Sequence, residues 1–462
     1  MKKVLALLLT LAMVFSLASC GSTAAGESTD SASTAVSAVE STEEAPEEAA
    51  PAEAEEVPAE EEAAPAEAEE APVEAEEASI EEATAEEPSV QEEAAPEEPL
   101  WEEVTDDRVV TVTDMSGDEV TIEGKVERIV NLWPAGTSSF FVMGAGELVD
   151  GLAVNNAGTV NSWAKLFYPA AGDIAAMGGT TPSIEELLAL DPDLVIVHPM
   201  TVSSGFAQEI RDAGIPAIDI NFSTYDTMIT SYTMLGEVLG GEYQYKLNSW
   251  CEMVAEKQAE IEEITADISE EDAPVVYYIA GQSDSLTTTM GSNSICADWT
   301  HLAGGIYATD LLEDTTVTEI TAEEIFAIDP DIIIVGGNYQ HVLVDELQNT
   351  DGWKDLSAVV NGKVYTNPYG AFAWDRFGLE SYFQLDYALY CINPELAADA
   401  GIDRDSILQE VYDFYVFMNG TELTDDELNN MFDGLEPDGS QLDPAAAGGG
   451  GGPAAGQSGT HG

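Results

Sequence analysis

Residues Ser183–Val197 read SIEELLALDPDLVIV, and residues Thr321–Val335 repeat the pattern as TAEEIFAIDPDIIIV. When the two stretches are aligned, a pair of glutamates, an alanine, an Asp-Pro-Asp sequence and a final apolar run coincide. The copies lie too far apart to be the period of a solenoid. The repeat therefore indicates one supersecondary unit that is used twice, once in each of two similar lobes.

Each copy predicts a short helix, a tight turn and a buried strand. Ser183 and Thr321 suit the N-cap position, and a glutamate three residues later completes a capping box. The proline of Asp-Pro-Asp disfavours the α conformation at the preceding aspartate, so the helix ends there. The strands that follow are apolar throughout, as expected of a parallel sheet that is covered on both faces. Apolar residues recur at helical spacing before each turn: Ile184, Leu187 and Leu188 in the first copy, and Ile325, Phe326 and Ile328 in the second.

The first turn of each predicted helix holds a second acid, Glu185 or Glu323, that is not the capping-box residue. A single acid at this position is expected only to favour the helix dipole, by about 0.3–1 kcal/mol. Because these two occupy matched positions in two lobes, they are also candidates for a pair of docking charges on one face of the molecule.

The amino terminus has the features of an exported, lipid-anchored protein. Lys2 and Lys3 precede an apolar core that is too short for a membrane anchor. The sequence Leu17-Ala18-Ser19-Cys20 resembles the bacterial lipoprotein cleavage box, which implies cleavage before Cys20 and lipid attachment to its thiol. We expect the lipid to hold the chain at the outer face of the cell membrane without a membrane-spanning segment.

Acidic residues dominate the charge of the chain: 89 Asp+Glu oppose 13 Lys+Arg, for a net charge of −76. Residues 21–100 contain neither lysine nor arginine and are rich in Ala, Glu and Pro, which predicts a disordered, extended spacer. This charge makes a nucleic-acid partner very unfavourable, because phosphate binding needs a basic surface. A long charged stalk suits the crossing of a thick cell wall, so we expect a Gram-positive cell.

The remaining chain alternates strand and helix patterns, which indicates an α/β fold with mostly parallel sheets. We expect the following segments: a signal peptide at 1–19, the lipidated Cys20 and the spacer at 20–106, an N-terminal lobe at 107–224, a helical region with a long interlobe helix at 225–270, a C-terminal lobe with closing helices at 271–433, and a disordered Gly-rich tail at 434–462. The three further cysteines, Cys251, Cys296 and Cys391, form no disulfide or zinc spacing and are expected to be buried small apolar residues.

In this order, the pattern VTVTDMSGDEVTI, the strand RIVNL, the first repeat copy, the "AGIP" strand, the long helix and the second repeat copy resemble the helix-linked binding proteins of ABC importers for iron-siderophores, haem and cobalamin. The resemblance covers about Arg108 to Met418 and implies two lobes that face each other across a ligand cleft. It also implies that Glu185 and Glu323 contact arginines of a permease, which works with its ATPase. A monomer without catalysis and without a cofactor of its own is expected.

Ligands of open α/β sheets bind beyond the carboxyl ends of the strands. The strand ends and the loops beside them provide the candidate ligand-binding residues: Trp133, Trp163, His198, Tyr278, Asn338, Tyr369, Trp374 and Arg376. Each also has a structural alternative. The aromatic residues suit lobe packing, His198 suits a bond to a loop carbonyl, and Asn338 suits the Gly-Gly turn before it. The guanidinium of Arg376 can hold a carboxylate or an oxyanion bidentately, or it can form a salt bridge with Asp375.

Aromatic residues together with one or two cationic groups predict a bulky, partly apolar, anionic ligand such as an iron chelate, haem or a corrinoid. A small oxyanion such as molybdate or tungstate is the alternative within the same fold. A stalked surface sensor or adhesin is a further alternative that the long spacer favours. An enzyme is not expected, because the sequence contains no G-x-S-x-G elbow, no H-E-x-x-H and no paired Cys/His signature.

Overall fold

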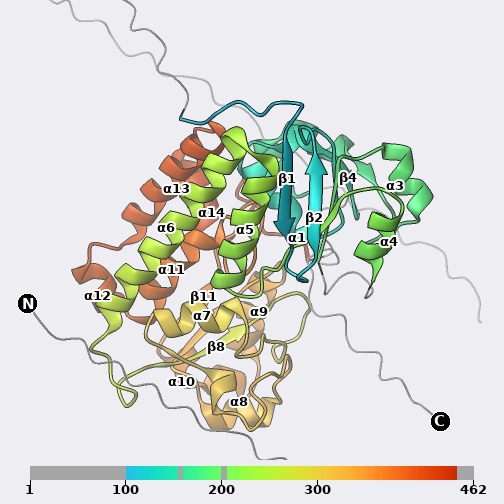
Figure 1. Cartoon of the computed structure of the whole chain (residues 1–462). Coiled ribbons are helices and arrows are strands. Elements are labelled where there is room, and N and C mark those ends of the chain that lie inside the picture. Colours follow the sequence, from blue (N-terminus) through green and yellow to red (C-terminus); the bar gives the residue numbers. More distant parts are fainter. Residues whose placement is uncertain (1–99, 155–159, 199–204, 445–462) are drawn as a thin grey trace, which may run out of the picture. The chain divides into compact units, whose positions relative to one another are not determined.

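The computed structural model describes residues 100–154, 160–198 and 205–444. The expected signal peptide, Cys20, nearly all of the acidic spacer and residues 445–462 of the tail lie outside these ranges. Within the described ranges, no helix has both the length and the apolar character needed to cross a bilayer. The described chain holds two parallel sheets, one in each lobe, with helices around them (Figure 1).

The N-lobe is built on a five-stranded parallel sheet whose strand order is β5-β4-β3-β6-β7. Its strands are β3 (Ile129–Asn131), β4 (Val149–Leu152), β5 (Ala175–Ala176), β6 (Leu194–Val197) and β7 (Ala217–Asp219). Its α-helices are α1 (Pro134–Val142), α2 (Ser162–Phe167), α3 (Ile184–Leu190) and α4 (Phe206–Asp212). Two 3-10 turns, η1 (Gly146–Leu148) and η2 (Pro169–Asp173), complete this lobe. All four residues of β6 are buried, as its apolar sequence predicts.

The C-lobe is built on a four-stranded parallel sheet in the order β11-β10-β8-β9. Its strands are β8 (Val275–Ile279), β9 (Ile306–Tyr307), β10 (Ile332–Val335) and β11 (Val364–Thr366). The helices of this lobe are α7 (Ile295–Leu302), α8 (Ala322–Ile328), α9 (Gln340–Asn349) and α10 (Ser357–Val360), with the 3-10 turns η3 (Ala308–Leu311) and η4 (Trp353–Asp355).

The two repeat copies adopt the same local structure. Both helices have a complete capping box, and both end at an aspartate in the left-handed region, with φ of 48° at Asp191 and 49° at Asp329. The last aspartate of each Asp-Pro-Asp accepts the backbone N–H at the start of the neighbouring central strand: Asp193 accepts from Arg128, and Asp331 accepts from Val275, both at 2.9 Å. The prediction of one unit used twice is therefore confirmed down to its hydrogen bonds.

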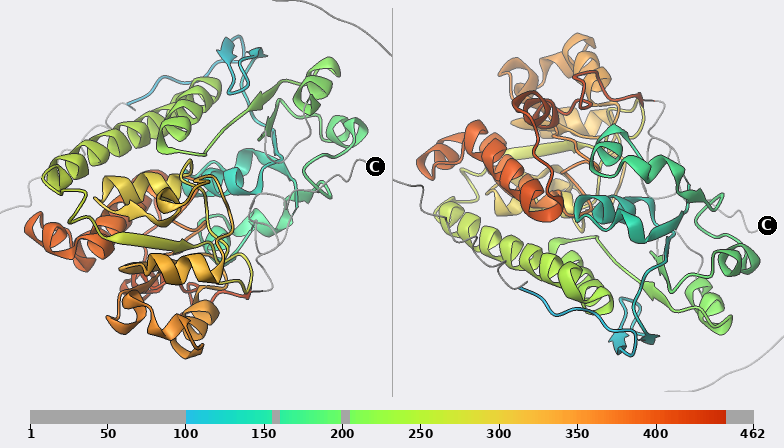
Figure 2. Two further views of the ribbon diagram at one scale, coloured as in Figure 1. Left: turned by 90° about the horizontal axis from the view of Figure 1, so that it is seen from below. Right: turned by 90° about the horizontal axis from the view of Figure 1, so that it is seen from above.

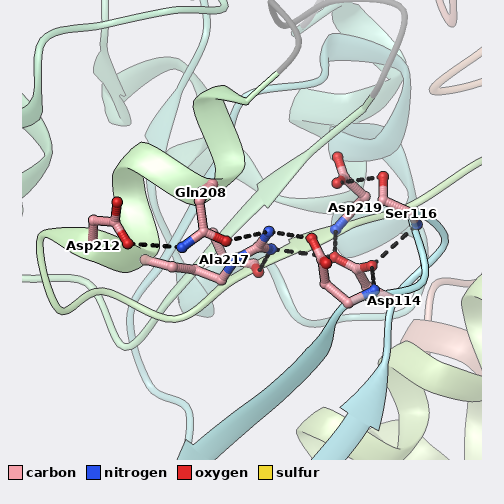
Figure 3. Close-up of polar contacts among 8 residues, drawn as sticks. Asp114, Ser116, Gln208, Asp212, Ala217 and Asp219 are labelled. Carbon is pink, nitrogen blue, oxygen red and sulfur yellow. Dashed lines mark hydrogen bonds and ion pairs between the residues drawn. The ribbon is translucent and has the colours of Figure 1, made fainter.

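An antiparallel hairpin, β1 (Val109–Thr113) and β2 (Glu119–Glu123), is attached to the N-lobe by an ion network (Figure 3). Arg211 of α4 donates from Nη1 to Asp114 of the hairpin turn at 3.3 Å and to the carbonyl of Ala217 at 3.0 Å. Ser116 Oγ donates to Asp219 at 2.7 Å. Burial raises the pKa of the Asp219 carboxyl. One half-buried arginine therefore joins the hairpin, α4 and the first residue of β7.

Two helices link the lobes, α5 (Tyr225–Leu239) and α6 (Gly241–Thr265). Figure 2 shows α6 as a long continuous helix, and α5 packs beside it through contacts such as Tyr232 with Trp250. Lys246 of α6 donates to the carbonyl of Met143 in the N-lobe at 3.1 Å. Farther along α6, Lys257 forms ion pairs with Asp386 at 2.7 Å and with Glu410 at 3.1 Å. The predicted interlobe helix therefore contacts the N-lobe near its start and the closing helices near its middle. The closing helices are α11 (Ser381–Ile392), α12 (Pro394–Asp399), α13 (Arg404–Asn419) and α14 (Asp425–Phe432).

Helix α1 begins at Pro134, because proline is favourable at the first helical position. The stretch before the first repeat copy contains the helix α2. One expectation about the fold needs correction. The tail expected to be disordered from residue 434 is folded as far as residue 444. We call residues 434–443 the C-terminal strap; Leu442 in it is buried, and Leu435 pairs with Gln441.

Candidate functional site

The carboxyl ends of the two central N-lobe strands carry aromatic side chains that touch each other. Trp133 follows β3 and His198 follows β6, and their rings are stacked with centroids 4.1 Å apart. Phe222 also packs edge-on against the ring of Trp133, with ring centroids 4.8 Å apart. All three side chains are buried. Two of the predicted ligand-binding residues are thus brought together at the edge of the sheet that the fold assigns to ligands.

A segment from the C-lobe side reaches this aromatic group. We call residues 367–380, between β11 and α11, the junction loop. The ring of Phe377 in this loop lies 5.5 Å from Trp133. Asn161, at the start of α2 in the N-lobe, donates from Nδ2 to the carbonyls of Gly370 at 2.9 Å and Ala371 at 3.2 Å. The junction loop therefore forms the contact between the strand ends of the two lobes.

Arg376 of the junction loop lies in a buried network with Asp375 and Tyr278. Its Nε donates to Asp375 Oδ1 at 2.7 Å, and its Nη2 donates to Tyr278 Oη at 2.9 Å and to the carbonyl of Ala280 at 2.8 Å. The Tyr278 hydroxyl donates to Asp375 Oδ2 at 2.8 Å. The salt bridge that the sequence left as the alternative role of Arg376 is thus present. The Nε and Nη2 atoms of Arg376 are thus occupied, whereas Nη1 has no hydrogen-bond acceptor among the described residues.

The electrostatics of this junction differ from the expected cationic character. Burial lowers the pKa of His198 to about 4, so its imidazole is neutral at neutral pH. Burial also opposes the charge of Arg376, but the adjacent Asp375 carboxylate raises its pKa and keeps it charged. Since Asp375 balances that charge, the described part of the junction carries little net positive charge. Of the one or two cationic groups expected, the described junction therefore holds Arg376 alone, and its charge is already paired with Asp375.

The junction loop is held in shape by a buried carboxyl group, Glu380. Its side chain accepts hydrogen bonds from the backbone N–H groups of Ala371 at 2.9 Å and Phe372 at 2.7 Å, and from the Tyr415 hydroxyl. Burial raises the pKa of Glu380 to about 7, against an ordinary value of 4.5. A group that titrates near neutral pH thus supports the loop that carries Arg376 and Phe377.

The other candidates have mainly structural contacts. Trp163 is fully buried and donates from Nε1 to the carbonyl of Leu435 in the C-terminal strap at 2.9 Å. Trp374 is fully buried against Phe383, and its Nε1 has no partner among the described residues. Asn338 donates to the carbonyl of Asp443 at 3.2 Å. Tyr369 Oη lies 3.4 Å from Asn338 Oδ1. These contacts place Asn338 and Tyr369 beside the strap and leave a ligand role for all four untested.

Sequence reasoning missed several residues that shape the junction. No sequence motif marks Phe222 or Phe377. The available signals were that Phe222 follows β7 and that Phe377 lies in a loop rich in aromatic residues. Asn161 is an N-cap of a helix that was not predicted. Glu380 was hidden because its sequence context resembles a helix start. In the described ranges, no group of three or more His, Cys, Asp or Glu side chains is arranged to hold a metal ion.

Glu185 and Glu323 lie on the surface of α3 and α8, one in each lobe. Neither forms an ion pair or a hydrogen bond through its side chain within the described residues. Their neighbours Glu186 and Glu324 are occupied by the capping boxes. Glu185 and Glu323 are therefore exposed carboxylates that take no part in the capping boxes.

Comparisons with known proteins agree with this architecture. The family model described as "Periplasmic binding protein" matches residues 152–369. The ABC transporter substrate-binding lipoprotein YvrC of Bacillus subtilis is 26% identical over 261 residues, which make up 55% of this chain and 77% of that protein. The Fe(3+)-citrate-binding protein YfmC of the same bacterium is 27% identical over 201 residues, or 43% of this chain and 61% of that protein.

The fold also matches a solved structure. The periplasmic solute binding protein from Veillonella parvula superposes with a TM-score of 0.60 at 22% identity, covering 72% of this chain and 99% of that one. This similarity concerns the fold alone. It confirms the predicted α/β class, with two lobes that hold mostly parallel sheets.

Proposed function

Because residues 152–369 belong to the periplasmic binding protein family, we propose that this chain is the substrate-binding component of an ABC importer and that it captures a metal chelate of the iron-siderophore, haem or corrinoid kind. The family consists of binding proteins for transport and not of enzymes, so the proposal requires no nucleophile or base. Delivery to a permease and its ATPase completes the function.

The observation that carries the proposal is the aromatic meeting point of the two lobes. Trp133 stacks on His198 within the N-lobe, with ring centroids 4.1 Å apart, and it faces Phe377 of the junction loop at 5.5 Å. Ligand sites are mostly apolar and aromatic, with a few polar groups that fix orientation. Trp133 and Phe377 supply the apolar surface, and Nη1 of Arg376 supplies a directed donor. This combination suits a large chelate with a partly apolar surface.

The charge balance at the junction argues against a small oxyanion as cargo. An oxyanion in a buried site needs a cationic partner or hydrogen-bond donors that are not already occupied. His198 is neutral because burial lowers its pKa to about 4, and Arg376 is paired with Asp375 at 2.7 Å. A large chelate spreads its charge and replaces more water from aromatic surface, so it depends less on these two groups.

The proposal places the chain at the outer face of the cell membrane through lipid on Cys20, as a monomer in a Gram-positive cell. The lipoprotein box supports the anchor, and the lipoprotein relative from Bacillus subtilis is consistent with it. The acidic spacer would then separate the binding lobes from the membrane. Glu185 and Glu323 are the residues proposed to meet the permease.

A fluorescence titration tests the choice of cargo. Purified chain from Cys20 onward, with Cys20→Ala, is titrated with ferric citrate, haemin, cyanocobalamin and molybdate. We expect at least one of the first three to quench tryptophan fluorescence saturably. Trp133→Leu should weaken that binding at least tenfold, because it removes the aromatic face that both lobes share.

Trp101→Phe is the matched control. Trp101 packs on Tyr245 of α6, 5.9 Å between ring centroids, and not at the junction, so this variant should bind within twofold of the parent chain. Saturable binding of molybdate alone would replace the chelate by an oxyanion. If none of the four probes binds saturably, the proposed cargo class is wrong.

A further inference from the structure

The two repeat helices share more of their surface than the two glutamates. From the N-cap over eight positions, Ser183–Leu190 and Thr321–Ile328 have the same order of exposed, half-buried and buried residues. Leu187 and Ile325 are buried in the two lobes. The next residue in each copy, Leu188 or Phe326, is instead exposed, to 50% and 39%. The helical apolar pattern thus contains one residue per copy that does not serve the core.

Each exposed apolar side chain lies beside the matched carboxylate. Residues three apart on a helix are neighbours on its surface, so Leu188 adjoins Glu185 and Phe326 adjoins Glu323. Ala189 and Ala327 follow and are also exposed, so no bulky side chain separates the pair from solvent on that side. Each lobe therefore presents one unpaired acid and one large apolar residue in the same arrangement.

Lobe packing explains only part of this exposure. Phe326 lies edge-on to Trp353 with ring centroids 5.2 Å apart, yet a large part of its surface stays in water. Leu188 has no aromatic neighbour of this kind among the described residues. Leaving the leucine and the phenylalanine partly in solvent gains nothing for folding, because burial of apolar surface is favourable. Their repetition at matched positions points to a surface that is covered in a complex.

We propose that Leu188 and Phe326 are the apolar anchors of the docking surface for the importer's permease, each adjoining the carboxylate of Glu185 or Glu323. This inference rests on the proposed function. The occupant is the outer face of a permease with two equivalent subunits or halves. Each half presents a cationic side chain, for the acid, beside an apolar depression, for the anchor.

The chemistry divides the work between the two kinds of residue. Exposed charges mainly set orientation and the association rate, and their effect falls with added salt. Apolar side chains at the centre of an interface mainly set the dissociation rate, because they lose their contact with water in the complex. Two copies of such a patch, one in each lobe, require a partner with two copies of the complementary patch.

The test uses ligand-free chain and the permease–ATPase complex of the source cell in lipid nanodiscs, with association and dissociation followed by surface plasmon resonance. The apolar variant is Leu188→Ser with Phe326→Ser, and the charge variant is Glu185→Gln with Glu323→Gln. The control variant is Val342→Ser with Val416→Ser, which changes two side chains that are 45% and 41% exposed outside the repeat.

We expect the apolar variant to raise the Kd at least tenfold, mainly through faster dissociation, and the control to stay within twofold of the parent. Each single substitution should contribute a separate factor, because the two sites lie in different lobes. The charge variant should slow association and lose its salt dependence. Phe326→Leu, which keeps an apolar side chain against Trp353, should bind nearly as the parent does, so a folding defect is distinguished from a lost anchor.

If the charge variant is impaired while the apolar variant binds within twofold of the parent, the anchor proposal is wrong and the importer function stands. If neither variant changes the Kd, the docking of this chain through α3 and α8 is itself wrong. If the control weakens binding as much as the apolar variant does, the effect is not specific to the repeat and the anchor proposal also fails.

Discussion

The two copies of the repeat are alike at their helices and unlike beyond their strands. Helices α3 and α8 have the same capping box and nearly the same left-handed φ at Asp191 and Asp329. After β6 the chain continues with His198, whereas after β10 it continues with Gly336 and Gly337. A Cβ on Gly336 would overlap the Asp375 carboxylate, so glycine is needed there. Aromatic rings thus lie at the strand ends of the N-lobe sheet. At the strand ends of the C-lobe sheet, the backbone of Gly336 lies directly against the Asp375 side chain.

This difference distinguishes the surface of helices α3 and α8 from the strand ends of the two sheets. The helix surface is repeated, which fits the proposed docking to a partner with two equivalent halves. The strand ends are not repeated, which fits the proposed binding of one cargo molecule between two different walls. The three predictions that follow test how far this division extends.

The largest effect concerns Glu380, the buried carboxyl group that supports the junction loop on the C-lobe side. Its folded pKa of about 7 exceeds its ordinary value of 4.5, so the native state favours the protonated carboxyl. Stability from this group is therefore complete below about pH 4.5 and is lost as the pH rises through 7. The shift corresponds to about 3 kcal/mol.

Urea unfolding at pH 5 and pH 8 measures this effect, and Glu380→Gln should remove most of the difference in the free energy of unfolding. Part of it should persist, because burial also raises the pKa of Asp386 to about 6, beside Lys257 and Glu410. An equal pH dependence in the parent and in Glu380→Gln would show that this carboxyl is ionised in the folded chain.

A smaller effect distinguishes the two helix ends. Alanine in the left-handed region costs about 1–2 kcal/mol, so both Asp191→Ala and Asp329→Ala should destabilise the chain. Asp329 also accepts hydrogen bonds from Ser357 N at 2.8 Å and Ser357 Oγ at 2.7 Å, whereas among the described residues the Asp191 side chain accepts only from Arg128. We expect about 2 kcal/mol for Asp329→Ala and about 1 kcal/mol for Asp191→Ala, since exposed pairs contribute little.

The measurement is the free energy of unfolding from urea titration. Asp191→Asn and Asp329→Asn serve as controls, because asparagine tolerates the left-handed region. Both asparagine variants should lie closer to the parent than the corresponding alanine variants. A larger loss at Asp191 than at Asp329 would contradict the assigned contacts.

The smallest expected effect is at His198, at the N-lobe strand end. Because burial lowers its pKa to about 4, its ring should show no protonation between about pH 5.5 and pH 8. Nitrogen chemical shifts of the imidazole, assigned with His198→Asn, give the readout. A titration near the ordinary value of 6.5 would mean that water reaches this ring, and it would restore His198 as a cationic ligand group.

Most of the fold was predictable because its signals are local. The capping boxes, the Asp-Pro turns and the apolar strands each depend on a few neighbouring residues, and they placed both lobes and the interlobe helix. Leu188 and Phe326 show the limit of the method. The helical apolar spacing includes them, but their exposure is decided by how the helix rests on its own lobe.

The site was less predictable because it depends on contacts between distant segments. Strand ends pointed correctly to Trp133 and His198 as neighbours. The pairing of Arg376 with Asp375 was foreseen only as an alternative, and the neutral state of His198 follows from burial that no sequence pattern reveals. Trp163 was selected as an aromatic loop residue, whereas its indole N–H is directed to the C-terminal strap.

The C-terminal strap forms hydrogen bonds with both lobes. Trp163 on the N-lobe donates to Leu435, while Gln340 and His341 on the C-lobe donate to the carbonyl of Gly434 at 2.9 Å and 3.1 Å. A polypeptide ring therefore runs from one lobe through α5 and α6 to the other and back through adjacent residues of the strap. Any motion that separates the lobes beside the strap has to break one of these hydrogen bonds, so residues 434–443 restrain the lobes in addition to α5 and α6.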